Sequence, residues 1–254
     1  MVGIVDNVFG IDLKGLIILL SVWPLVDLSG HLARVIVRRV RIEMAEMDWP
    51  VVRLDLPARL LQRLFAVWLL GNATWLAWDP PLCTGHLMSA LLLLITMATL
   101  GALAWVDAET GILPNELILL VIPIVFLWHW QVSGETLPDT SFLWGMTLGY
   151  GVPIFFNGVY LAFTGSDALG QGDAKLLAVI GLWLGAAALT DVWLVACALL
   201  LVYTAVKRCG DPSQLSLKSS IPFGPFLVMA ANVVFIGGSV WNVKNRTDRR
   251  HRLW

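Results

Sequence analysis

The stretch that decides the fold is LMSALLLLITMATLGALAWV, residues Leu87 to Val106, which contains no charged side chain. A helix that adds about 1.5 Å per residue needs about 20 apolar residues to cross a hydrocarbon layer of about 30 Å. The whole chain agrees with this segment, because 58% of its residues are hydrophobic and only 14% are charged. Soluble domains carry about 25% charged residues. The sequence therefore predicts a membrane protein.

Further apolar stretches predict additional spans. Leu176–Val206 would run about 46 Å as one helix, too long for a bilayer without extreme tilt, so we expect two short spans with a turn near Asp191. The other predicted spans are Gly15–Gly30, Leu64–Trp78, Leu117–Trp130, Ser141–Phe163 and Ile221–Val243. The expected fold class is all-α, a polytopic bundle of about eight transmembrane helices.

Basic residues orient the predicted bundle, because short cytoplasmic loops are rich in Lys and Arg. One segment stands out by its arginines, which are Arg34, Arg38, Arg39, Arg41, Arg53, Arg59 and Arg63. Placing it in the cytoplasm also places Asp107–Glu116 and Gly165–Lys175 there. We expect three regions: 1–63 with the first span and the Arg-rich loop, 64–243 as the membrane core, and 244–254 as a basic tail. Eight spans put this tail outside, against the same rule.

Charge and cysteine usage exclude several classes. The net charge of -1 gives no reason to expect nucleic acid as a partner. The cysteines Cys83, Cys197 and Cys209 are far apart and the histidines are scattered, so no metal site is expected. No cofactor is predicted either. The acidic Asp6 and Asp12 near the N-terminus do not fit a cleavable signal peptide.

Two acidic segments fall on the same predicted membrane face. Asp107 directly follows the uncharged span, and Asp173 follows Gly170-Gln-Gly172 at the start of a predicted helix. A close pair of aspartates cannot both ionise, so the pair shares one proton. One member can then activate water while the other donates a proton to a scissile carbonyl. Such a pair can hydrolyse a peptide bond without metal, and either residue could take either role.

A plainer interpretation competes with catalysis. An aspartate at a helix end is often a cap or an interfacial charge, and Glu109, Glu116 and Asp167 look the same by composition. A transporter that relays protons through membrane acids is another class. It predicts acids deep within spans, whereas Asp107 and Asp173 lie at predicted span ends.

Three motifs in order resemble the type IV prepilin peptidases among the G-x-G-D membrane aspartic peptidases. They are Asp107 followed by Leu113-Pro114-Asn115, Gly170-Gln-Gly172-Asp173 followed by Ala174-Lys175-Leu176-Leu177, and Ile221-Pro-Phe-Gly-Pro-Phe226. Together they cover roughly Leu87 to Ile236. A lone G-x-G-D would be weak, but the ordered set is specific.

The resemblance implies a multi-pass enzyme of the bacterial inner membrane that removes basic leaders from prepilins or pseudopilins on the cytoplasmic side. It implies Asp107 and Asp173 as catalytic residues, and Gly170 and Gly172 as residues that shape the loop. Pro114 and Asn115 belong to the first motif. Lys175, two residues from Asp173, points elsewhere on a helix and is interpreted as an interfacial lysine.

The N-terminal part departs from the family pattern. Many members carry two C-x-x-C pairs in the first cytoplasmic loop, associated with methylation of the new N-terminus, whereas residues 34–63 contain no cysteine. This departure argues against N-methyltransferase activity and a need for S-adenosylmethionine. A preflagellin-type peptidase and a non-catalytic assembly factor for pili or secretion remain alternatives. Gly181 and Gly185, four residues apart, predict a face for internal helix packing.

Overall fold

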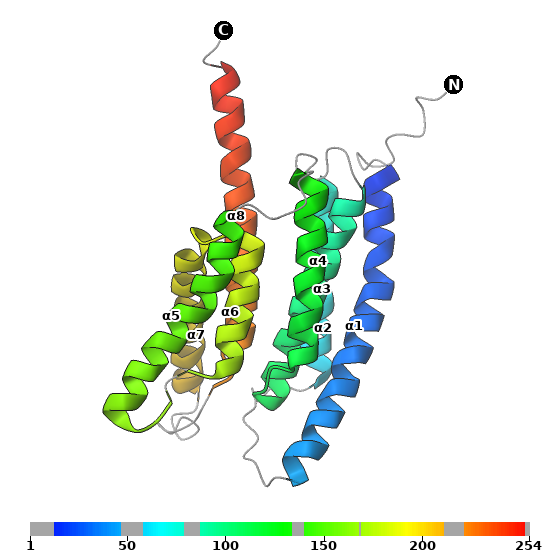
Figure 1. Ribbon diagram of the computed structural model, residues 1–254. Coiled ribbons are helices and arrows are strands. Elements are labelled where there is room, and N and C mark those ends of the chain that lie inside the picture. The colour runs from blue at the N-terminus through cyan, green and yellow to red at the C-terminus, as the bar shows by residue number, and fades with distance from the viewer. Residues whose placement is uncertain are drawn as a thin grey trace. The chain divides into compact units, whose positions relative to one another are not determined.

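The computed structural model describes residues 13–46, 58–78, 87–133, 140–167, 169–210 and 221–251. Over these ranges the chain forms eight α-helices and no strand (Figure 1). The prediction of an all-α fold is confirmed. The helices are α1 (Leu13–Glu46), α2 (Ala58–Trp78), α3 (Leu87–Thr110), α4 (Asn115–Ser133), α5 (Thr140–Thr164), α6 (Gln171–Leu184), α7 (Ala188–Gly210) and α8 (Gly224–His251).

Five of the described helices are long and apolar enough to cross a membrane. The corresponding segments are Ile17–Ala45, Leu87–Thr110, Asn115–Val132, Thr140–Thr164 and Ala188–Cys209, with Gly224–Gly238 as a shorter apolar helix. The protein is therefore a multi-pass membrane protein. Asp6, Asp12, Arg53, Cys83 and the chain beyond His251 lie outside the described residues.

The chain forms two compact units, each described here by itself. Unit 1 comprises Met1–Pro138 and Ser220–Pro225, and unit 2 comprises Asp139–Ser219 and Phe226–Trp254. The functional division expected from the sequence, at residues 63 and 243, stays a prediction.

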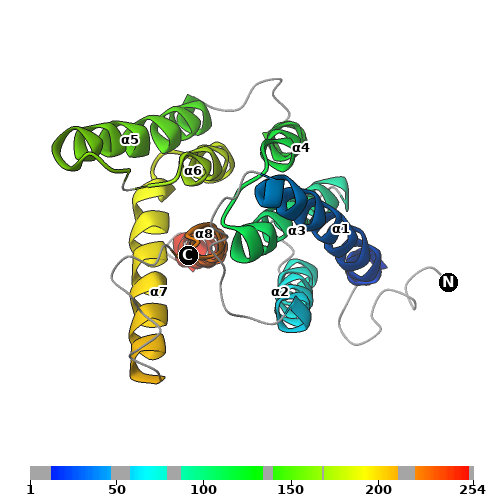
Figure 2. The ribbon, with the colours of Figure 1, turned by 90° about the horizontal axis from the view of Figure 1, so that it is seen from below.

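In unit 1, α3 is flanked by α1, α2 and α4 (Figure 2). It is the uncharged helix predicted first, and Leu93, Leu94 and Met97 on it are almost completely buried. Gly101 lets α2 approach, because a Cβ atom there would lie 2.4 Å from the ring of Phe65. This packing makes α3 the centre of the unit.

The first helix is longer than predicted. The sequence suggested a span ending at Gly30 and then an Arg-rich loop, but α1 continues to Glu46 and includes all four arginines from Arg34 to Arg41. The loop prediction was wrong there because arginine is a good helix former. Buried apolar residues also continue at helical spacing through Ala33, Val37, Val40 and Met44.

In unit 2, α5 and α6 are packed side by side through glycines (Figure 1). A Cβ atom at Gly145 would lie 2.2 Å from the carbonyl oxygen of Gly181, and one at Gly149 would lie 2.5 Å from that of Leu177. The prediction that Gly181 packs internally is confirmed. Gly185 also lies against α5, because a Cβ atom there would be 3.1 Å from Oγ of Ser141, and its φ of 86° ends α6.

The break between α6 and α7 lies earlier than predicted. It spans residues 185–187, whereas Asp191 was expected at the turn and instead lies in the first turn of α7. An acidic residue there is favoured by the helix dipole and need not mark a turn. Helix α7 extends away from the α5–α6 pair (Figure 2). Trp183 of α6 packs on Phe235 of α8, with ring centroids 4.9 Å apart.

Candidate active site

Asp107 lies in the last turn of α3 and is only 3% exposed. The helix ends just beyond it at Gly111, whose N–H donates to the carbonyl oxygen of Asp107 at 2.7 Å. The φ angle of Gly111 is 68°. Glycine adopts this left-handed conformation without steric cost. The hydroxyl of Thr110 donates to the Val106 carbonyl at 2.7 Å and accepts from the Ile112 N–H at 3.3 Å. The turn after Asp107 is therefore tightly defined.

A backbone donor from a distant segment meets the Asp107 carboxyl. The N–H of Gly224 donates to Oδ2 of Asp107 at 2.9 Å, across 117 residues of sequence. Gly224 is the first residue of α8, and a helix N-terminus favours a negative group. A Cβ atom at Gly224 would lie 2.7 Å from the same oxygen, so no larger residue fits without displacing the carboxyl. The Ile221–Phe226 motif thus supplies both the donor and the space for it.

Asp173 occupies the third position of α6, as its predicted place at a helix start requires. Gly170 caps this helix with extended backbone, φ −66° and ψ 138°, and its carbonyl accepts from the Asp173 N–H at 3.1 Å. The Asp173 side chain folds back toward the cap, because a Cβ atom at Gly170 would lie 3.3 Å from its Oδ2. The side chain is half-buried, and this burial raises the pKa of Asp173 to about 6.

The loop that leads into Asp173 is fastened to α5 by Asn157. The side-chain amide of Asn157 donates to Oδ1 of Asp167 at 2.8 Å, and its oxygen accepts from the Leu169 N–H at 3.0 Å. Gly165, with φ at 70°, ends α5 and turns the chain into this loop. Asn157 therefore fixes the approach to the Gly170–Asp173 motif.

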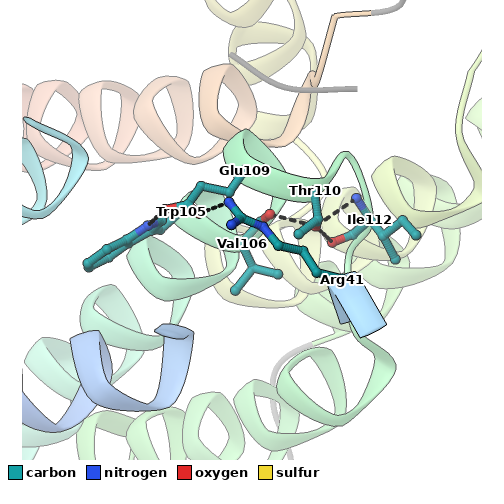
Figure 3. A network of polar contacts seen from close by, with 6 residues as sticks. All are labelled: Arg41, Trp105, Val106, Glu109, Thr110 and Ile112. Carbon is teal, nitrogen blue, oxygen red and sulfur yellow. Dashed lines mark hydrogen bonds and ion pairs between the residues drawn. The ribbon is translucent and has the colours of Figure 1, made fainter. Parts of the chain in front are cut away.

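Glu109, two residues after Asp107, is a third acidic residue with defined partners. Figure 3 shows Arg41 and Trp105 converging on its carboxylate. Arg41 Nη2 lies 2.7 Å from Oε2, and the indole N–H of Trp105 donates to Oε1 at 2.6 Å. By composition Glu109 was indistinguishable from Asp107, but the structure gives it an ion-pair partner.

The remaining predicted site residues divide between the two units. In unit 1, Pro114 is buried before α4, where its carbonyl accepts from the Ile118 N–H at 3.4 Å, and Asn115 is exposed as the first residue of α4. In unit 2, Gly172 and Lys175 are half-buried on α6. Lys175 lies about 200° around the helix from Asp173. Its interpretation as an interfacial lysine stays a prediction.

Sequence reasoning missed Gly224, Arg41 and Asn157 as site residues. Gly224 stood inside a recognised motif, which was a usable signal. Arg41 had none, because it resembled its neighbouring arginines. Asn157 had a weak signal as a polar residue within an apolar span, which sequence reasoning interpreted as helix-to-helix hydrogen bonding at least as readily as a functional group. Their partners lie 68 residues away for Arg41, and 10 and 12 residues away for Asn157.

Comparison with known proteins places these residues in a family. Residues 94–205, which include both aspartates, match the type IV leader peptidase family. Leader peptidase HopD of Salmonella typhimurium is 32% identical over 163 residues, which cover 61% of this chain and 95% of HopD. The chain belongs to the type IV leader peptidase family.

The prepilin leader peptidase/N-methyltransferases that resemble the chain are longer than it is. A prepilin leader peptidase/N-methyltransferase of Neisseria gonorrhoeae is 31% identical over 60% of this chain, and one of Pectobacterium carotovorum is 34% identical over 64%. In both cases the match covers 51% of the relative, so the chain spans about half the length of these bifunctional relatives. No solved structure matches the chain.

Proposed function

We propose that this leader peptidase is an aspartic endopeptidase that cleaves the leader from prepilins or pseudopilins at the cytoplasmic face of the inner membrane. Asp107 and Asp173 are its catalytic residues. The observation that carries the proposal is that Asp107 lies in the last turn of α3 and Asp173 in the first turn of α6, and that a glycine lies close to the carboxyl group of each. Similarity to HopD over almost all of HopD's length supports leader cleavage.

The proposed reaction is a hydrolysis in which one carboxylate accepts a proton from water. The resulting hydroxide equivalent adds to the scissile carbonyl carbon while the protonated carboxyl donates to the carbonyl oxygen. The tetrahedral species then collapses, and the amine leaves with a proton. The pair returns to its single-proton state without a covalent intermediate or a metal.

The surroundings of the two aspartates support distinct resting roles. The N–H donor of Gly224 at a helix N-terminus suits a carboxylate, so Asp107 is assigned as the base. Burial raises the pKa of Asp173 to about 6, so near neutral pH it holds a proton more readily than an ordinary aspartate, and it is assigned as the acid. The proposal requires the two carboxyl groups to approach closely enough to flank one water molecule.

The cytoplasmic location rests on the arginines of α1. Arg41 reaches Glu109, so the basic end of α1 and the Asp107 end of α3 are the same end of unit 1. Short basic segments remain in the cytoplasm. Gly170 and Gly172 are proposed to shape the loop before Asp173, and Pro114 and Asn115 to set the start of α4 after Asp107.

Co-expression with a type IV prepilin, followed by mass spectrometry of the pilin N-terminus, tests the proposal. Wild-type protein should release the leader, and Asp107→Asn or Asp173→Asn should each lower the cleavage rate at least ~100-fold, because each removes an acid–base group. Membrane insertion of both variants is the control. Normal processing by either variant would refute the assignment of that residue.

The same spectrum separates the alternatives. No methyl group is expected on the product, because residues 34–63 lack the cysteine pairs associated with methylation. A non-catalytic assembly factor would leave the leader on every prepilin tested while still co-purifying with it. A preflagellin-type peptidase would process an archaeal preflagellin in preference to prepilins.

A further inference from the structure

Glu109 is a buried carboxylate at the C-terminal end of a helix, where a negative charge is unfavourable. Its side chain is 10% exposed, and it lies in the last turn of α3, where the helix dipole disfavours a carboxylate. Burial of an unpaired charge is costly, so such a group needs a partner. Arg41 and Trp105 are the partners found there.

These residues join α1 and α2 to the end of α3. Arg41 comes from α1, and the Trp105 ring lies 3.5 Å from the Cβ position of Gly30 on α1 and 6.1 Å, between ring centroids, from Phe65 on α2. Both contacts meet on one carboxylate. Rotation of the end of α3 would break the ion pair with Arg41 and move the Trp105 ring, which is hydrogen-bonded to the same carboxylate, out of its contacts with α1 and α2.

Asp107 lies on the other side of the same turn. Residues two apart on a helix are separated by about 200° around its axis. Glu109 therefore faces α1 while Asp107 faces Gly224, and a rotation that moves one carboxyl group moves the other. The contacts of Glu109 thus set the direction in which Asp107 points.

We propose that Arg41, Glu109 and Trp105 form a positioning clamp that fixes the rotation of the last turn of α3 and so aims the Asp107 carboxyl. This inference rests on the proposed peptidase function and assigns the N-terminal helix a part in it. Helix α1 lies outside the residues that match the family, yet it supplies the cationic member of the clamp.

Arg41→Met tests the clamp, and Arg39→Met is the matched control. Arg39 pairs with Glu43 on the same helix, but both side chains are exposed, at 69% and 53%. Arg41→Met should lower kcat for prepilin cleavage at least about tenfold with KM within about twofold, because small misplacement of a reacting group is costly. Arg39→Met should leave both constants unchanged. Equal kcat for Arg41→Met and wild type overturns the clamp.

A double variant guards against a simple folding defect. The double variant Arg41→Met with Glu109→Gln should lose little more than either single variant, because the two residues act as a pair. Fully additive losses overturn the pairing.

Amide hydrogen exchange reports the clamp without catalysis. In Arg41→Met, exchange of the peptide containing Trp105–Asn115 should accelerate at least about tenfold, while Arg39→Met exchanges as wild type does. If wild-type protein cleaves no prepilin, the proposed function fails, and the exchange result still decides the clamp. If wild type cleaves but Arg41→Met changes neither exchange nor kcat, only the clamp fails.

Discussion

At the scale of single residues, each aspartate is accompanied by a glycine that leaves its carboxyl group room. The tighter case is Gly224, where a Cβ atom would lie 2.7 Å from Oδ2 of Asp107. Gly224→Ala should therefore push the carboxyl away from its backbone donor and lower the cleavage rate at least ~100-fold, as small misplacements do. The N-terminus of the co-expressed pilin reports the loss.

The same helix supplies the control for this substitution. A Cβ atom at Gly237 of α8 would meet nothing within 4 Å, so Gly237→Ala should cleave as wild type does. Both variants add one methyl group to α8, but only Gly224→Ala places it against the Asp107 carboxyl. Unchanged cleavage by Gly224→Ala would show that the Asp107–Gly224 contact is dispensable.

The raised pKa of Asp173 predicts a pH-dependent stability. Burial raises this pKa from 3.8 to about 6, so between these values the folded state binds a proton that the unfolded state has released. The free energy of unfolding therefore falls as pH rises through this window, and the loss persists above it. Asp173→Asn, which is neutral at every pH, removes this penalty.

Thermal unfolding of the purified proteins measures the effect, with the 13 tryptophans as the fluorescent signal. The midpoint of Asp173→Asn should exceed that of wild type at pH 8, and the difference should shrink as pH falls toward about 4. A difference that stays constant with pH would mean that the titration of Asp173 does not contribute to stability.

At the scale of helices, the α5–α6 pair shows why small residues matter in a membrane. Gly181→Ala would place a methyl group 2.2 Å from the carbonyl oxygen of Gly145, and backbone cannot move aside as a side chain can. Overpacking of this kind typically costs about 1–3 kcal/mol. The thermal midpoint of Gly181→Ala should fall, whereas Gly151→Ala on α5, with open space around it, should leave the midpoint unchanged.

Most of the helices could be predicted from the sequence. Apolar length predicted α3, α4 and α5 to within a few residues, since a spanning helix is dictated by local composition. The errors at α1 and α6–α7 arose where charged residues were interpreted as loop or turn signals. Helix α1 continues through Arg34–Arg41 because Val37 and Val40, which lie between these arginines, are buried. Asp191 is favourable in the first turn of α7, and the residue that ends α6 is Gly185.

The candidate site could be predicted only in part, because the residues that contact its acidic side chains are distant in sequence. Motifs pointed to Asp107 and Asp173, but hydrogen bonds across 68 and 117 residues placed Arg41 on Glu109 and Gly224 on Asp107. No periodicity encodes such contacts. They depend on tertiary packing, which decides which of several similar arginines meets a buried carboxylate.

At the scale of the whole molecule, the distribution of charge predicts the orientation on which the proposed cytoplasmic cleavage depends. The arginines at the end of α1 and the Asp107 end of α3 are joined by the Arg41–Glu109 ion pair, so both should face the cytoplasm. Met88, the second residue of α3, lies at its opposite end, about 33 Å from Thr110 at about 1.5 Å per residue, and its side chain is exposed. Glu116, in the first turn of α4, is exposed on the Asp107 side.

Single cysteines at these two positions can report the orientation, in a background where Cys83, Cys197 and Cys209 are replaced by serine. A membrane-impermeant maleimide added to cells with an opened outer membrane should label Met88→Cys, and should label Glu116→Cys only after the inner membrane is broken. Retained prepilin cleavage by the cysteine-free background is the control. The reverse labelling pattern would place Asp107 outside the cytoplasm, where a leader that stays on the cytoplasmic side cannot reach it.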